Sequence, residues 1–150
     1  MPRYLEDFEI GETWTSKPVE ITEDDIVTFA RQYDPQPMHT DPEKAAQSRF
    51  GGVIASGWHV VALSMRLFIE AGGHQGTPAV GLGIDELRWR KPVRPGDCLT
   101  VHREVVGIER SQSRPEYGRL RTRVTVVNQD GATVLTMISI GQVPARPAAA

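Results

Sequence analysis

The densest group of polar side chains that could perform chemistry lies in one short segment, where four residues separate Asp34 from His39 and Asp41 follows closely. A carboxylate and an imidazole form a natural acid–base pair near neutral pH. Pro35 and Pro37 predict a stiff loop, because each lacks a backbone donor and biases the residue before it away from helix. The simpler alternative is that Asp34 caps a turn and His39 is an ordinary loop histidine. The segment therefore gives a candidate acid–base pair whose support depends on its surroundings.

Other candidate residues carry weaker signals. His59 lies near the start of a predicted buried helix, where it has either a structural role or a place in a ligand pocket. Asp34, His39 and Asp41 could bind zinc or iron, but no compact ligand motif is present, so we expect no metal. A local basic stretch could meet phosphate groups or an acidic protein surface, or could be a solvated strand end. It comprises Arg88, Arg90, Lys91 and Arg94.

The helices that would position these residues can be predicted from capping signals and hydrophobic spacing. Thr22 precedes three acidic residues and then a one-sided apolar pattern, which predicts a short amphipathic helix ending at Asp34. Asp41, followed by proline, predicts a second short helix to about Arg49. Residues 57–71 are apolar around almost the whole helical circumference. Such a helix must be buried.

After this helix the pattern changes to strands bounded by proline and glycine. The predicted strands are about 80–91, 99–109, 117–128 and 133–143, with an N-terminal strand near 12–18. The clearest alternation places Leu120, Thr122, Val124 and Val126 inward and the intervening arginines outward. One long buried helix, followed by antiparallel strands long enough to curl around it, predicts an α+β fold.

The bulk composition limits the possible partners. The 150 residues suit one domain, which we place at residues 1–143, followed by a flexible Pro/Ala-rich tail at 144–150. A formal charge of -2 gives no overall attraction to nucleic acid or to anionic membranes, and no apolar stretch approaches the roughly 20 residues of a membrane-spanning helix. With a single cysteine and no secretory pattern in residues 1–11, we expect a cytoplasmic protein.

Two motifs resemble the signature of MaoC-like hydratases and dehydratases, a hotdog-fold family that includes (R)-specific enoyl-CoA hydratases. They are Asp34-Pro-Gln-Pro-Met-His39-Thr-Asp41-Pro and Phe50-Gly-Gly-Val-Ile-Ala-Ser-Gly57. The resemblance covers nearly the whole chain. It implies a single hotdog domain, in which an antiparallel sheet wraps around a long buried helix, and a homodimer or larger homo-oligomer.

By this resemblance, Asp34 and His39 are the catalytic pair, and the backbone N–H of Gly57 donates to the thioester oxygen. In family hydratases a helix hydroxyl can support the aspartate, and Ser64 is the nearest candidate. Hydration of an enoyl thioester needs a base for the water, a proton for Cα and a donor for the enolate-like oxygen, and these groups suffice. The residues expected to contact substrate are Ser56, Trp58, His59, Arg88, Arg90 and Lys91.

The expected activity is reversible hydration of an enoyl thioester to the 3-hydroxyacyl thioester, with coenzyme A or an acyl carrier protein as the carrier and no metal or cofactor. This activity would belong to fatty acid metabolism. The chain differs from the enoyl-CoA hydratase pattern at Gln36 and Ser56, where asparagine and histidine are usual, so the acyl group is left open. One alternative is a hotdog thioesterase, which would release free thiol. Another is a non-catalytic acyl-CoA-binding protein, which would need no acid–base pair.

Overall fold

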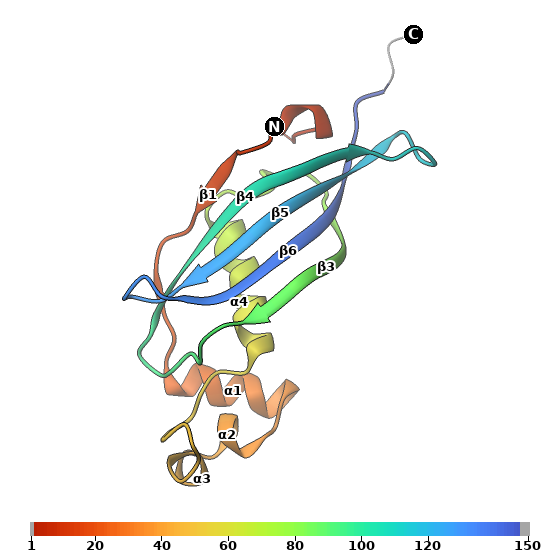
Figure 1. The fold of residues 1–150 in the computed structure, drawn as a ribbon. Helices are drawn as coiled ribbons and strands as arrows, with labels where there is room; N and C mark the ends of the chain where they lie inside the picture. Colours follow the sequence, from red (N-terminus) through yellow and green to blue (C-terminus); the bar gives the residue numbers. More distant parts are fainter. Residues whose placement is uncertain (1, 148–150) are drawn as a thin grey trace.

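The longest helix, α4 (Gly57–Glu70), forms where the sequence is apolar on nearly every side. Ser56 caps its start by accepting a hydrogen bond from the N–H of Trp58, and Gly72 follows its end with a left-handed φ of 88°. The computed structural model, which describes residues 2–147, places α4 against the concave face of a curved sheet (Figure 1). The sequence prediction of a long central helix is confirmed.

The sheet is antiparallel and has the order β1-β4-β5-β6-β3, with β2 also paired to β4. Its strands are β1 (Thr13–Thr15), β2 (Val19–Glu20), β3 (Val80–Trp89), β4 (Cys98–Arg110), β5 (Tyr117–Val127) and β6 (Thr133–Pro144). The predicted alternation in β5 is confirmed, because its even-numbered residues are buried. An antiparallel sheet around one long helix also confirms the predicted α+β class.

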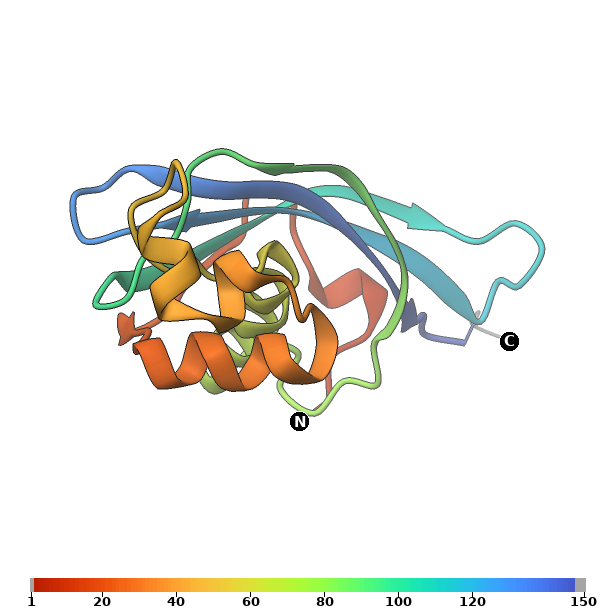
Figure 2. The same ribbon diagram turned by 90° about the horizontal axis from the view of Figure 1, so that it is seen from below.

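Three short helices cluster near the start of α4, on the same side of the sheet (Figure 2). They are α1 (Glu23–Tyr33), α2 (Pro37–Thr40) and α3 (Pro42–Ala46), and a 3-10 turn, η1 (Leu5–Asp7), lies near the N-terminus. The helix α2 corrects the expectation that residues 34–39 are irregular throughout. Pro37 occupies the first position of α2, where a missing N–H costs nothing. The second predicted helix ends at Ala46, earlier than Arg49.

One side of α4 packs on the sheet, and the other side is open. Leu63 and Leu67 belong to a core cluster with buried residues of β4, β5 and β6. Trp58, Met65 and Ile69 are exposed on the same helix. Burial of α4 on all sides, as its sequence predicts, is therefore not reached within one chain.

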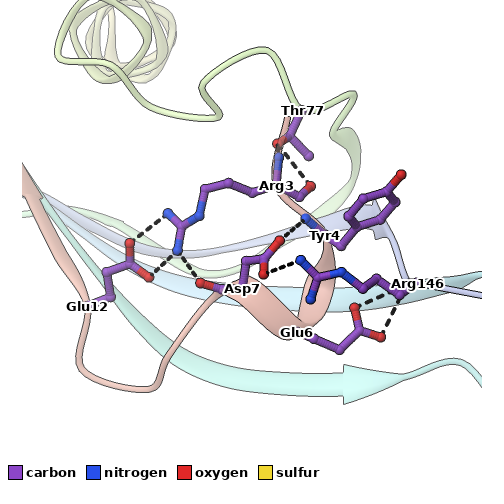
Figure 3. A network of polar contacts seen from close by, with 7 residues as sticks. All are labelled: Arg3, Tyr4, Glu6, Asp7, Glu12, Thr77 and Arg146. Atoms are coloured by element: carbon purple, nitrogen blue, oxygen red, sulfur yellow. Dashed lines mark hydrogen bonds and ion pairs between the residues drawn. The ribbon is translucent and has the colours of Figure 1, made fainter. Parts of the chain in front are cut away.

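Polar contacts tie the N-terminal turn to the residues after β6 (Figure 3). The backbone N–H of Arg146 donates to both carboxylate oxygens of Glu6, and its guanidinium contacts Asp7 at 2.7 Å. Ala145 is buried. The sequence predicted a flexible segment from Pro144, whereas Pro144–Arg146 lie against the body of the protein. Residues 148–150 of that predicted tail fall outside the described residues, and the domain boundary stays a prediction.

The length of the helices bears on membrane insertion. Even α4 has only 14 residues. In the part of the chain that the structure describes, no helix combines the length and the apolar character needed to cross a membrane.

Candidate active site

Asp34 is positioned at the end of α1, where its backbone N–H donates to the carbonyl of Ala30 at 2.8 Å. Its carboxylate accepts two hydrogen bonds, from Gln36 Nε2 to Oδ1 at 2.6 Å and from Ser56 Oγ to Oδ2 at 2.7 Å. Burial by itself raises the pKa of Asp34. The two hydrogen bonds and the nearby His39 lower this pKa by a larger amount, so it lies below its ordinary value. Asp34 is therefore a carboxylate at neutral pH.

His39 lies in α2 and is only 4% exposed. Its Nδ1 is 2.6 Å from the carbonyl oxygen of Ile54. Because a carbonyl oxygen can only accept, Nδ1 must carry the hydrogen. The other nitrogen, Nε2, faces Asp34 Oδ2 at 3.4 Å. The Ile54 contact therefore leaves Nε2 as the atom that can give or take a proton beside the carboxylate.

Gly57 is the first residue of α4, and no hydrogen bond from its N–H is found within residues 2–147. The first N–H groups of a helix lack partners within the helix and carry partial positive charge. A Cβ added at Gly57 would lie 2.3 Å from the indole of Trp89, so only glycine fits this contact. The N–H of Gly57 is thus available to an oxygen atom of a ligand.

These three residues line one cleft with a volume of about 430 Å³. Its apolar wall includes Val60 and Val134, and two indoles, Trp58 and Trp89, meet edge to face at 5.2 Å. The exposed basic residues Arg49, Arg90 and Lys91 also line the cleft. The cleft therefore combines a proton-transfer pair, a free backbone donor, apolar walls and positive charge.

The structure shows a contact between Ser56 and Asp34 that the sequence did not indicate. Ser56 is fully buried, and its hydroxyl donates to Asp34, so it supports the carboxylate. Ser64, the hydroxyl suggested by the resemblance, donates to the carbonyl of Val61 in its own helix, and this corrects that assignment. The position before a helix-opening glycine was a usable signal, because serine is a preferred helix cap.

Three of the six residues expected to contact substrate are not in the cleft lining: Ser56, buried behind Asp34, and also His59 and Arg88. His59 lies outside the cleft lining, stacked on Phe29 with ring centroids 4.6 Å apart, and it lines a different cavity. Burial lowers the pKa of His59, which favours its neutral form. Arg88 is exposed and is not among the residues that line the cleft. Trp58, Arg90 and Lys91 do line it, and their binding roles stay predictions.

The three residues that the sequence offered as metal ligands do not form one cluster, although Asp34 and His39 face each other. Asp41 caps α3, where its carboxylate accepts a hydrogen bond from the N–H of Lys44. Across residues 2–147, no group of three or more histidine, cysteine, aspartate or glutamate side chains is placed to hold a metal ion. Three residues of the site were not assigned a role from the sequence: Gln36, which lies two positions after Asp34, Arg49, and Trp89.

Comparison with known proteins shows which family this chain matches. Residues 7–128 match the family model described as MaoC like domain. The chain is 38% identical over 125 residues to an uncharacterized protein, YdeM, of Bacillus subtilis (strain 168), which covers 83% of this chain and 87% of that protein. It is also 35% identical over 118 residues to the 3-hydroxybutyryl-CoA dehydratase of Methylorubrum extorquens, covering 74% of this chain and 70% of the relative.

A solved structure shows the same arrangement. The MaoC-like dehydratase from Rhodospirillum rubrum superposes with a TM-score of 0.86 at 37% identity, and the match covers 97% of this chain and 99% of that chain.

Proposed function

This chain belongs to the MaoC-like domain family of hydratases and dehydratases, and from this premise we propose that it catalyses reversible hydration of an enoyl thioester to the 3-hydroxyacyl thioester. The observation that carries the proposal is the convergence of three groups on one cleft: the Asp34 carboxylate, His39 Nε2 at 3.4 Å from it, and the N–H of Gly57. An enzyme of this kind is a hydro-lyase.

The geometry supports a division of labour between the two side chains. Asp34 holds a water molecule and accepts its proton as the oxygen bonds to Cβ. The electron pair of the double bond then moves toward Cα and the thioester oxygen, where the N–H of Gly57 stabilises the developing negative charge. His39, protonated on both ring nitrogens, delivers its Nε2 proton to Cα, and the proton that Asp34 took from water then passes to Nε2 across the 3.4 Å contact. Dehydration follows the same steps in reverse.

The substrate carrier is proposed from charge. Arg49, Arg90 and Lys91 are exposed and line the cleft, so they can meet the phosphates of coenzyme A or the acidic surface of an acyl carrier protein. The Methylorubrum relative is named as a dehydratase of a CoA thioester, and this supports coenzyme A as the carrier. The apolar walls suit an acyl chain. We propose a place in fatty acid metabolism in the cytoplasm, with no metal or cofactor in the reaction.

Homodimer formation is also part of the proposal. β3 lies at the edge of the sheet, and Val80, Leu82 and Ile84 expose large apolar side chains along it. Met65 and Ile69 expose further apolar surface on α4. An exposed edge strand of this kind is a template for pairing with another strand. A second copy of this chain would cover it.

A panel of enoyl-CoA substrates of increasing chain length tests the reaction. Hydration removes the enoyl absorbance without releasing thiol, whereas a thioesterase releases free thiol. The expected result is loss of enoyl absorbance with no thiol. Thiol release, or binding without any turnover across CoA and carrier-protein thioesters, would contradict the proposal and favour one of the two alternatives.

A further inference from the structure

A second cavity lies beneath the sheet beside the C-terminal end of α4, at Phe68, which is about 17 Å along that helix from Gly57 at the usual rise per residue. Its aromatic lining comes from Phe8, Trp14 and Phe68. The free volume is about 20 Å³, which is room for about one water-sized occupant. This cavity shares no lining residue with the Asp34 cleft.

Arg103 of β4 is the unusual member of this cavity. It is only 4% exposed, and its guanidinium stacks 4.1 Å from the ring centroid of Phe68. Its buried Nε has no hydrogen-bond partner, and no ion pair of Arg103 is found in residues 2–147. Burial lowers the pKa of Arg103 to about 10, which still leaves it charged at neutral pH. A buried charge without a counter-charge is costly. The Arg103 guanidinium therefore needs a negatively charged partner, and the chain itself does not supply one.

The other polar side chains of the cavity can all donate hydrogen bonds. Thr122 and Ser139 are cross-strand partners on β5 and β6, and His74 comes from the segment after α4. Among residues 2–147, no carboxylate lines the cavity. Burial, and then the nearby Arg103, lower the pKa of His74, so it is neutral and adds no second charge. A guanidinium with surrounding N–H and O–H donors is the chemistry that holds an anion.

We propose that this cavity is a binding site for a small monovalent anion of the size of chloride, held by Arg103. The small cavity suits an anion of this size better than phosphate, and the guanidinium disfavours a cation. Because the positive charge is enclosed by Phe68 and its aromatic neighbours, a bound halide would act as its counter-ion.

A bound anion would also stabilise the segment that covers the cavity. Residues 71–79 join α4, which begins at Gly57, to β3, which ends at Trp89. His74 and Gln75 have left-handed φ angles of 62° and 48°, which are unfavourable for residues other than glycine. Thr77 ties the end of the segment to the backbone of Arg3 through two hydrogen bonds (Figure 3). An anion between Arg103 and His74 would hold the strained part of the segment in place.

Thermal unfolding in bromide tests the site. The Tm of the full chain is measured with increasing sodium bromide at constant ionic strength, balanced with sodium gluconate, whose anion is too large for the cavity. We expect the Tm to rise by several degrees in bromide, because a ligand that binds only the folded state stabilises it. Arg103→Met should abolish the bromide dependence. The matched control is Arg123→Met, which removes an exposed strand arginine paired with Glu104 and should keep the dependence.

Two measurements on the unaltered protein keep the proposal testable if Arg103→Met fails to fold. Crystals grown in bromide should show an anomalous peak beside Arg103, and bromide should raise the pKa of His74 in an NMR titration, because a nearby anion favours the imidazolium. A bromide peak only on the surface, an unchanged His74 titration, or an Arg103→Met protein that responds to bromide like the wild type would each overturn the proposal.

Discussion

At the scale of single residues, the candidate site is organised around the hydrogen bonds of one carboxylate. Gln36 donates to Asp34 Oδ1 and Ser56 donates to Oδ2, which also faces His39 Nε2. Each carboxylate oxygen can accept two hydrogen bonds, so Oδ1 keeps a free acceptor position for water. The carbonyl of Ile54 fixes the hydrogen on the far side of His39. The pair is therefore oriented before any substrate arrives.

Replacement of the carboxylate tests its role directly. Asn is nearly isosteric with Asp but cannot act as a base, so Asp34→Asn should lower kcat by about 10²- to 10⁴-fold with little change in substrate affinity or Tm. Asp41→Asn is the matched control, because Asp41 caps α3 outside the cleft and asparagine caps equally well. Turnover at the wild-type rate in Asp34→Asn would end the assignment of the site.

Loss of the Ser56 hydroxyl should change the pH dependence. The bond from Ser56 lowers the pKa of Asp34, so Ser56→Ala should raise that pKa and shift the acid limb of kcat/KM to higher pH. The same bond stabilises the folded protein above the pKa of an unfolded aspartate, and this contribution disappears as the pH falls through the lowered pKa. The Tm difference from wild type should therefore narrow in acid.

The control for this change is another buried serine on the same helix. Ser64 donates to Val61 and does not reach Asp34, so Ser64→Ala should leave the acid limb in place. Ser56→Thr keeps a hydroxyl and should restore much of the wild-type profile. An acid limb that does not move in Ser56→Ala would show that this hydroxyl serves only as the cap of α4.

At the scale of elements, the sequence predicted most of the site's framework, because local signals were strong. Thr22 and the acidic first turn located α1, and the apolar pattern of residues 57–71 located α4. The contacts that join these elements were less accessible. Ser56 and Asp34 are 22 positions apart, and no periodicity in either segment indicates that their side chains meet. The short helix α2 was missed because two prolines in six residues outweighed the helix-start signal of Pro37.

The junction of α4 with the end of β3 depends on one glycine. A Cβ at Gly57 would meet the Trp89 indole at 2.3 Å, so Gly57→Ala should force the ring away and destabilise the fold by about 1–3 kcal/mol, as overpacking usually does. Activity should fall as well, because the N–H of Gly57 is the proposed oxyanion donor. Chemical denaturation and kcat measure the two effects separately.

A second substitution distinguishes the clash from other effects of alanine. Gly57→Ala combined with Trp89→Ala should recover stability relative to Gly57→Ala alone, since the obstructing ring is gone. Gly52→Ala is the control, because a Cβ there meets no atom within 4 Å and its φ is not left-handed. If Gly57→Ala were as stable as Gly52→Ala, the contact with Trp89 would not constrain this position.

At the scale of the whole molecule, the apolar surface left open by one chain is concentrated on the edge strand and on one side of α4. The sequence predicted that α4 is buried all round, yet Trp58, Met65 and Ile69 are exposed. Composition could not reveal this, because the sequence of a helix is the same whether its cover comes from its own chain or from a second copy. The fold of the single chain was predictable from the sequence, whereas its assembly rests on the resemblance and on the exposed surface.

Disruption of the β3 edge should separate the subunits. Leu82 and Ile84 are 48% and 44% exposed and lie two positions apart on a strand that pairs only with β6 in the described chain. If β3 pairs with its copy, Leu82→Arg with Ile84→Arg would bury positive charges facing one another in the dimer, which costs far more than their exposure on a monomer. Sedimentation velocity should then show a monomer, whereas we expect the wild type to sediment as a dimer. Ile10→Arg, at an exposed apolar residue outside β3, should remain dimeric. A double variant that still sediments as a dimer would mean that the subunits join through another surface, with the exposed side of α4 the next candidate.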